Sequence, residues 1–287
     1  MENVSRTKRG VSVGPTAVDM YLDLLAKCLT RTIFLEEYRP VDPPKGTLKG
    51  LLFTPVQALL RRLGYHLVYR IRPDPLARAE GRDWPPSAET MVGLYRLANV
   101  RELAEDVLSA GIPGDFMECG VWRGGVAIFM KAILEAYGDK ERRVWLADSF
   151  RGLPKPNPQL YPLDAELDLW RWRQLAVSVE EVRENFRRYG LLDDRVQFLQ
   201  GWFHDTLPTA PVEKLALLRI DADLYESTMD ALRWMYPKLS VGGWVIVDDY
   251  GAIPACKAAV EDFRQRTGIK EPLCWADWTA VYWRKEK

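Results

Sequence analysis

Short apolar runs alternate with amphipathic segments over most of this 287-residue chain, from about residue 86 to its end. The runs that we expect to form strands are DFMECGV, RRVWLADSF, VQFLQGW, LALLRIDAD, GWVIVDDY and WTAVYWRK. Segments with apolar residues at helical spacing separate them, and the first of these runs from Ala88 to Ala110. This alternation predicts an α/β fold for residues 86–287, with a doubly wound, mostly parallel sheet covered by helices on both faces.

The first 85 residues have helical spacing but no strand signals. Apolar residues recur at helical intervals from Thr16 to Phe34 and again from Leu51 to Tyr69, which predicts two helices. A stretch rich in proline and charge follows, IRPDPLARAEGRDWPPSAE, and we place a domain boundary in it, near Pro85. We expect residues 1–85 to form a helical cap or lid, which could also mediate a homo-oligomer.

Charge and cysteine content exclude several classes of protein. The 40 basic and 40 acidic residues cancel, so nothing indicates a nucleic-acid partner. The four cysteines show no CxxC or comparable spacing, which argues against structural zinc and a disulfide framework. No apolar run approaches the ~18 residues of a membrane span, and the charged start MENVSRTKRG leads into no apolar signal core. We therefore expect a cytoplasmic protein that does not contact a membrane.

Two acidic clusters follow two of the expected strands. Asp221 and Asp223 lie at the end of LALLRIDAD, and Asp248 and Asp249 lie near the end of GWVIVDDY. The 27 residues between Asp221 and Asp248 correspond to one strand–helix–strand crossover of ~30 residues, so parallel neighbours would bring the clusters to one edge of the sheet. Three carboxylates from separate elements suit Mg²⁺ or another divalent cation, while Asp221 and Asp223 are candidate bases. Alternatively, the first pair solvates a loop and Asp249 caps the next helix.

A glycine-containing turn and one further aspartate point to a second part of the same site. The turn from Glu118 to Gly125 joins a strand to a helix, where glycines and free amides let a ligand approach the backbone. It is not a GxGxxG sequence, and a tight turn without a ligand is the alternative. Asp148 ends the next strand, where an acidic residue commonly binds ribose hydroxyls, although a loop aspartate is also possible.

Histidines contribute little to the expected site. The chain has only His66 and His204, from which we exclude a zinc site built on histidines and regard a Ser-His-Asp triad as improbable. His204 follows a strand end and could face the pocket, although such a residue is more often a surface or packing histidine.

The combination of VWRGG, ADSF, DxDLYEST and VDDY resembles the macrocin O-methyltransferases, which methylate sugar hydroxyls on macrolides and related natural products. The matching segments extend from about Glu89 to the C-terminus, and the stretch near Tyr21 to Thr32 resembles the N-terminal part of that family. The resemblance implies a seven-stranded, Rossmann-like class I fold that uses S-adenosylmethionine and a divalent metal, with a site similar to that of catechol O-methyltransferase.

The resemblance also assigns roles to individual residues. It implies cofactor contacts at Thr90, Met91, Glu118, Gly120, Val121, Trp122, Arg123, Gly124, Asp148, Ser149, Gly201 and Trp202. It implies metal ligands at Asp221, Asp248 and Asp249, with Asp223 as the base. Some relatives that modify sugars carry a histidine in the loop after ADSF, but DLWRWRQLAVS has none, so that base is excluded and its tryptophans could shape an aromatic acceptor pocket.

The predicted function is therefore a Mg²⁺-dependent O-methyltransferase that acts on a small-molecule hydroxyl, most simply that of a sugar on a natural product. Two alternatives from other classes remain open. One is a metal-dependent phosphoesterase or nucleotide-processing enzyme that uses the same aspartates. The other is a non-catalytic partner protein that binds the cofactor, although the complete acidic set argues against it.

Overall fold

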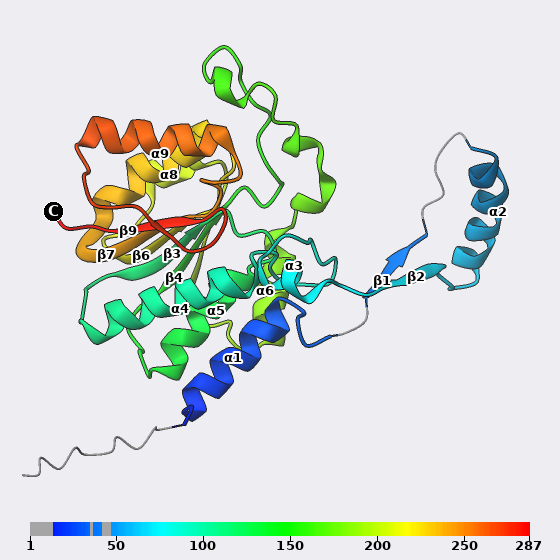
Figure 1. Ribbon diagram of the computed structural model, residues 1–287, viewed down its shortest axis with the longest axis horizontal. Helices are drawn as coiled ribbons and strands as arrows, with labels where there is room; N and C mark the ends of the chain where they lie inside the picture. Colours follow the sequence, from blue (N-terminus) through cyan, green and yellow to red (C-terminus); the bar gives the residue numbers. More distant parts are fainter. Residues whose placement is uncertain (1–13, 35–36, 42–46) are drawn as a thin grey trace, which may run out of the picture.

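The computed structural model describes residues 14–34, 37–41 and 47–287, and the body of the protein is a seven-stranded sheet between two layers of helices (Figure 1). The strands are β3 (Asp115–Cys119), β4 (Val144–Asp148), β5 (Val196–Gln200), β6 (Leu215–Ile220), β7 (Leu239–Val247), β8 (Cys274–Trp275) and β9 (Val281–Arg284). Their order is β5-β4-β3-β6-β7-β9-β8, and the first five are parallel while β9 and β8 pair antiparallel. This confirms the predicted doubly wound, mostly parallel sheet.

The direction of strand order reverses between β3 and β6. From β3 the chain builds outward through β4 and β5, and it then returns to the other side of β3 with β6 and β7. The crossover connections on the two sides therefore diverge above the carboxyl ends of β3 and β6, and such a crevice is where sheets of this kind bind ligands. The register pairs Cys119 with Ile220 and Ile220 with Val247, so the residues that follow these three strands share one edge.

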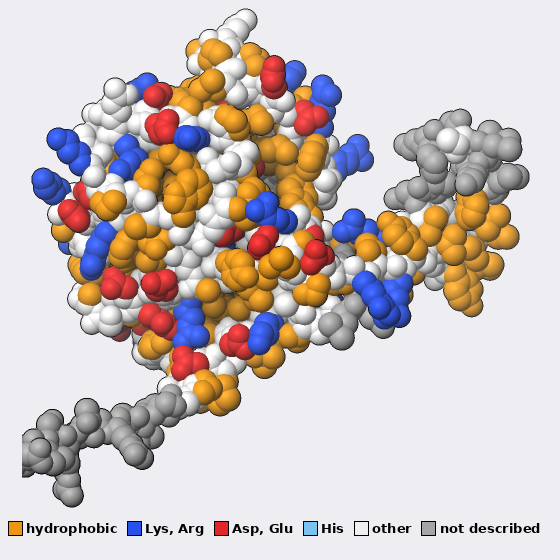
Figure 2. Space-filling model, in the orientation of Figure 1, with side chains coloured by type: hydrophobic (Ala, Val, Ile, Leu, Met, Phe, Trp, Pro, Cys, Tyr) orange, Lys and Arg blue, Asp and Glu red, His pale blue; other side chains and the backbone are white. Residues whose placement is uncertain are grey.

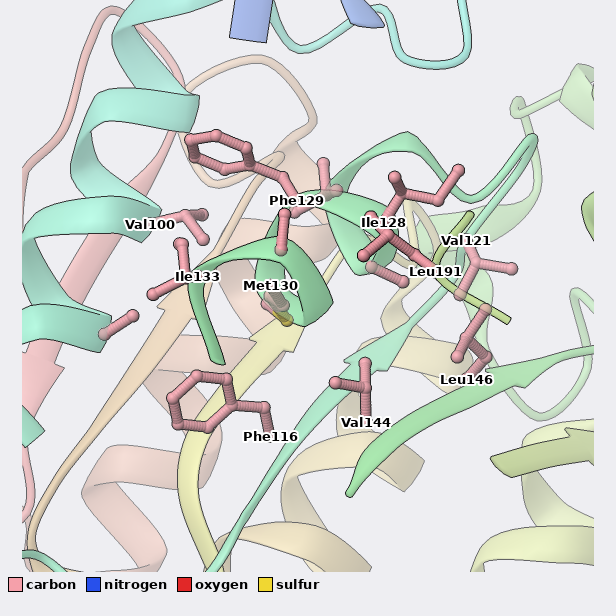
Figure 3. Packing of buried hydrophobic residues seen from close by; sticks show 14 of the residues in the cluster. Val100, Phe116, Val121, Ile128, Phe129, Met130, Ile133, Val144, Leu146 and Leu191 are labelled. Carbon is pink, nitrogen blue, oxygen red and sulfur yellow. The ribbon is translucent and has the colours of Figure 1, made fainter. Parts of the chain in front are cut away.

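Each face of the sheet is covered by its own helices, because successive strand residues point to opposite sides. Phe116 faces a cluster formed with α1 (Ala17–Leu29), α4 (Gly93–Ser109), α5 (Gly125–Ala136) and α6 (Val179–Arg188). Its neighbour Met117 faces the cluster formed with α8 (Tyr225–Met235) and α9 (Pro254–Thr267). Figure 3 shows the first cluster, in which Phe129 and Ile133 of α5 pack beside Val100 of α4 and above the strands.

Helix α1 is the part of residues 1–85 that packs against the body. Its N-terminus is closed by a capping box, in which the Thr16 side chain accepts from the Asp19 amide and the Asp19 side chain accepts from the Thr16 amide. At its C-terminal end, the Leu29 carbonyl oxygen accepts hydrogen bonds from the amides of Glu89 (3.1 Å) and Thr90 (3.3 Å). The Glu89 carbonyl oxygen in turn accepts from the Gly125 amide (3.0 Å). The first helix thus holds the segment that leads into the pocket described below.

The remainder of the leading segment differs from the helical prediction. Strands β1 (Glu37–Pro40) and β2 (Val68–Ile71) form an antiparallel hairpin, and together with α2 (Leu48–Arg62) they project from the body as an arm (Figure 1). The prediction of a helix as far as Tyr69 was wrong because Gly64, at φ +83°, follows the end of α2. The β-branched and aromatic residues after it favour a strand.

Smaller differences concern element boundaries. The stretch predicted as a linker contains the short helix α3 (Pro75–Ala79), which is capped by Asp74. Helix α4 begins at Gly93 rather than at Ala88, and β8 was not predicted because two residues are too short for a periodic pattern. Among the described residues, no helix is both long and apolar enough to cross a membrane. Residues 1–13, in which we expect no signal sequence, lie outside the described part.

Candidate functional site

A pocket opens above the carboxyl ends of β3, β4, β5 and β6, where the strand order reverses. Most of the residues predicted for the site contribute to its wall. These are Thr90, Met91, Glu118, Gly120, Val121, Trp122, Asp148, Ser149, Gly201, Trp202, Asp221 and Asp223. The four that are not part of this lining are Arg123, Gly124, Asp248 and Asp249. The structure thus brings the glycine turn, Asp148 and the first acidic cluster together in one cavity.

The turn between β3 and α5 lies very close to the end of β6. Gly120 has φ +84°, and a Cβ at this position would lie 1.8 Å from the carbonyl oxygen of Asp221, so only glycine fits. Gly124 (φ +82°) immediately precedes α5, and a Cβ at this position would meet Val182. Arg123 points away from the lining and donates to the carbonyl oxygens of two residues that precede Thr90. Gly124 and Arg123 therefore contribute to the conformation of the turn without lining the pocket.

Asp148, at the end of β4, connects this turn to the neighbouring strand by hydrogen bonds. Its Oδ2 accepts from the Val121 amide (2.8 Å) and its Oδ1 accepts from the Phe150 amide (2.7 Å). Burial raises the pKa of Asp148, and these amide hydrogen bonds oppose the rise. The Gly201 amide donates to the Asp148 carbonyl oxygen (2.9 Å), which brings the end of β5 beside β4. Asp148 therefore acts as a loop aspartate, which was the alternative interpretation of its sequence position. The same residue also lines the pocket.

Glu118 is a buried carboxyl with one unpaired oxygen in the pocket wall. Its Oε1 accepts from Arg219 Nη1 (2.6 Å), whereas its Oε2 is buried without a hydrogen-bond partner among the described residues. Burial raises the pKa of Glu118 to about 8, although the Arg219 guanidinium opposes this. An unpaired buried acceptor of this kind suits a ligand that carries an N–H or O–H donor.

The two acidic clusters meet at the end of β6 and β7. One carboxylate oxygen from each of Asp221, Asp248 and Asp249 can be chosen so that all three lie within 4.8 Å of one another. The alternative in which Asp249 caps the following helix is wrong, because α9 begins after Ile253 and has no side-chain cap. The Asp249 side chain instead accepts from the Asp223 amide (3.2 Å). Three convergent carboxylates match the oxygen donor set that hard divalent cations prefer.

Two arginines that we did not predict hold this cluster. Arg219, within β6, contacts Asp248 and Asp221, the latter at 3.0 Å. Arg96, on α4, contacts the other oxygen of Asp248 and lies 3.1 Å from Asp277. Arg219 had a signal in the sequence, because a charge inside the apolar run LALLRI needs a buried acidic partner. Arg96 had none, since its partner Asp248 lies 152 residues away.

The two arginines lower the pKa of Asp248, whereas the pKa values of Asp249 and Asp223 are raised. Burial raises the pKa of Asp248, but the guanidiniums of Arg219 and Arg96 outweigh it and hold that pKa below its ordinary value. Burial and the neighbouring carboxylates raise the pKa of Asp249 well above its ordinary value and that of Asp223 to about 8. Asp223 also has φ +56°, an uncommon conformation for a residue other than glycine. A carboxyl with a pKa near 8 is able to exchange a proton at neutral pH.

The loop after β4 covers one side of the site. Asp164, fully buried in this loop, accepts from the amides of Tyr225 (2.7 Å) and Glu226 (3.1 Å) at the start of α8. Trp172 packs edge-on against Trp84, with ring centroids 5.3 Å apart. Trp170 and Trp172 are not part of the pocket lining, so their role in an acceptor pocket stays a prediction. His204 does line the pocket, as the sequence allowed.

Comparison with known proteins identifies the chain's relatives. Residues 18–285 match the family described as macrocin-O-methyltransferase (TylF). The 8-demethyl-8-(2,3-dimethoxy-alpha-L-rhamnosyl)-tetracenomycin-C 4'-O-methyltransferase of Streptomyces olivaceus is 49% identical, over 93% of this chain and 93% of its own. Mycinamicin III 3''-O-methyltransferase of Micromonospora griseorubida is 43% identical, over 94% of this chain and 98% of its own.

A solved structure agrees with these sequence matches. The O-methyltransferase NovP is 45% identical and superposes with a TM-score of 0.80, covering 94% of this chain and all of its own. The predicted class I methyltransferase fold is thereby confirmed. The chain belongs to the macrocin O-methyltransferase family and is an O-methyltransferase.

Proposed function

We propose that this enzyme transfers the methyl group of S-adenosylmethionine to a sugar hydroxyl of a natural product and that it requires Mg²⁺ or another divalent cation. The observation that carries the proposal is the single pocket shared by the glycine turn, Asp148 and the acidic residues after β6. The names of the two curated relatives describe methylation of a rhamnosyl-bearing tetracenomycin and of mycinamicin III, which supports a glycoside acceptor. Neither the phosphoesterase nor the non-catalytic alternative has comparable support.

The donor side of the pocket has features that fit S-adenosylmethionine, which supplies a methyl group bound to a sulfonium. The unpaired Oε2 of Glu118 would accept from the amino group at the methionine end, beside Thr90 and Met91. Asp148, with Ser149, would bind the ribose hydroxyls. The adenine would lie near Gly201 and Trp202, which belong to the same wall.

The acceptor side would be organised by the carboxylates. Asp221, Asp248 and Asp249 would hold a divalent cation, which lowers the pKa of an acceptor hydroxyl. Arg219 and Arg96 each contact one oxygen of Asp248 and so fix the orientation of this carboxylate. Asp223 would accept the hydroxyl proton, with Asp221 as the other candidate base. In-line methyl transfer needs no covalent enzyme intermediate, so alignment of the two substrates is the main task of these side chains.

We further propose that residues 1–85 act as a cap over the acceptor and as the contact between copies in a homo-oligomer. The support is that α1 holds Thr90 through Leu29, while the arm leaves apolar side chains exposed. A cytoplasmic location stays a prediction.

The proposal is tested by removing one metal ligand. We expect Asp249→Asn to abolish methyl transfer while S-adenosylmethionine affinity, measured by calorimetric titration, stays within about threefold. Asp194→Asn, which changes an exposed loop carboxylate, serves as the matched control and should behave as the wild type. Full turnover by Asp249→Asn, or by the wild type in excess EDTA, would overturn the metal requirement. Absence of S-adenosylmethionine binding by the wild type would overturn the donor assignment.

A further inference from the structure

Three side chains with metal-binding groups converge on the pocket rim, away from the aspartates described above. His204 lies on the short helix α7 (Phe203–Thr206), and Glu226 and Asp230 lie on α8. One ligand atom from each can be chosen so that all three lie within 4.8 Å of one another. All three residues line the pocket, beside the turn that carries Trp202.

Asp230 offers the pocket a little-exposed carboxylate that no hydrogen bond or ion pair of the described residues satisfies. The residue is 8% exposed, and its oxygens are not among the fully buried unpaired atoms, so they are accessible from the pocket. Glu226 lies four positions earlier on the same helix, so the two carboxylates share one face, where like charges destabilise a helix. Arg233 and His204 are the charged groups that attract Asp230, and neither forms an ion pair with it. A charged carboxylate with so little access to water is stabilised when a cation binds it.

The donor set differs from that of the aspartate cluster. One imidazole nitrogen with two carboxylate oxygens suits zinc, cobalt or nickel, whereas an all-carboxylate set suits magnesium. The presence of two histidines argues against a zinc site built on histidines, whereas a site completed by carboxylates needs only one imidazole. The other histidine, His66, follows helix α2 in the arm and does not take part.

We propose that His204, Glu226 and Asp230 form a second metal site, which binds a divalent transition-metal ion of the zinc class. The ion would neutralise the two carboxylates and join α7 to α8, with water at its remaining positions. Because Trp202 immediately precedes α7, the ion would also fix the end of the pocket that lies beyond Asp148. This site would exist whether or not the proposed methyl transfer uses Mg²⁺.

The presence of only two histidines makes a direct test possible. Protein without a histidine tag is labelled with ¹⁵N, and the two imidazole signals are assigned by His66→Ala. ZnCl₂ is then added to the wild type in excess Mg²⁺ and to Asp249→Asn, in which the aspartate cluster is disabled. We expect one equivalent of Zn²⁺ to shift the ring nitrogens of His204 in both proteins and to leave those of His66 unchanged.

Single substitutions then separate a built site from a surface histidine. Asp230→Asn and Glu226→Gln should each weaken Zn²⁺ binding by about tenfold or more, while Asp205→Asn should change it by less than about twofold. Asp205 is the matched control because its Oδ1 lies 3.3 Å from His204 Nε2 but outside the cluster. The His204 side chain is 54% exposed, so His204→Ala leaves the core intact and should abolish Zn²⁺ binding at this site. An unshifted His204, or equal binding by Asp230→Asn and the wild type, would refute the site.

Discussion

The carboxyls around β6 and β7 behave differently because of the arginines beside them. Asp248 lies between Arg219 and Arg96 and is therefore held in its charged form. Asp249 forms no such ion pair with the described residues, and burial and the neighbouring carboxylates raise its pKa. Without a cation, the residues that would bind the metal therefore oppose folding to different extents.

Asp249→Asn should stabilise the metal-free protein. The pKa of Asp249 is raised in the folded state, so its ionisation lowers stability as the pH rises from its ordinary value, near 4, toward the raised value. In EDTA at pH 8, we expect Asp249→Asn to melt about 2–4 °C above the wild type. This difference should shrink at pH 5, where the wild-type carboxyl is more often protonated. Thermal melts at both pH values measure the effect, and a lower melting temperature for the variant at pH 8 would contradict it.

Arg219→Met should strongly destabilise the protein, since Arg219 is the buried cation shared by Glu118, Asp221 and Asp248. Removing one partner of a buried ion pair costs about 3–5 kcal/mol. We expect a loss of that size in the free energy of unfolding, measured by urea denaturation in EDTA. Arg188→Met, at an exposed position of α6, should change it by less than about 0.5 kcal/mol. Equal losses for both variants would show that Arg219 is not the central cation of the cluster.

At the scale of single elements, the turn between β3 and α5 determines how closely β3 and β6 approach at the pocket. Gly120 is required twice, once for its positive φ and once because a Cβ would collide with the Asp221 carbonyl. Such a collision with backbone cannot be relieved by a change of rotamer. Gly138, just after α5, also has a positive φ (+72°), but a Cβ there would meet nothing within 4 Å.

Alanine substitutions at Gly120 and Gly138 distinguish the cost of a positive φ from the cost of a collision between a Cβ and the neighbouring backbone. Gly138→Ala should cost about 1 kcal/mol of stability, the usual penalty for a positive φ. Gly120→Ala should cost clearly more and should also weaken binding of S-adenosylmethionine by about tenfold or more, because the turn must move away from β6. Urea denaturation and calorimetric titration of the two variants provide the comparison. Cofactor binding that is unchanged in Gly120→Ala would show that the turn does not contact the cofactor.

The elements that could be predicted are those with local signals. Apolar runs and helical spacing mark β3 to β7 and their helices, and parallel neighbours imply that Asp221 and Asp248 meet. The missed features depend on distant partners or very short segments. Arg96 reaches Asp248 from another helix, and Asp164 reaches the start of α8 from a loop without regular period. The β1–β2 hairpin was missed because helical spacing continues into the sequence of β2.

At the scale of the whole molecule, the arm is the part least covered by the rest of the chain. Figure 2 shows hydrophobic side chains on the described part of the arm, apart from the body. On α2 and just after it, Leu59 and Leu63 are 60% and 62% exposed. Apolar side chains gathered on a projecting element are typical of a contact with another protein.

If the arm joins copies of this enzyme, replacing its exposed leucines with polar residues should dissociate the oligomer. We expect the wild type to have more than the mass of one chain in size-exclusion chromatography with light scattering. The double variant Leu59→Ser, Leu63→Ser should shift toward the mass of a single chain. Leu160→Ser, at an equally exposed position in the loop after β4, should not change the mass. A wild type that is monomeric at all concentrations would exclude this role for the arm.

The hydrogen bonds that join the end of α1 to the pocket edge are made by main-chain atoms. The Leu29 carbonyl holds Glu89 and Thr90, and the Glu89 carbonyl holds Gly125. Hydrogen bonds of this kind do not depend on which side chains the residues carry. Leu29 itself is fully buried in the core, but exposed side chains near these hydrogen bonds can change while the geometry of the pocket edge is retained. Such changes would let an enzyme of this design acquire new acceptors without rebuilding the site that holds its methyl donor.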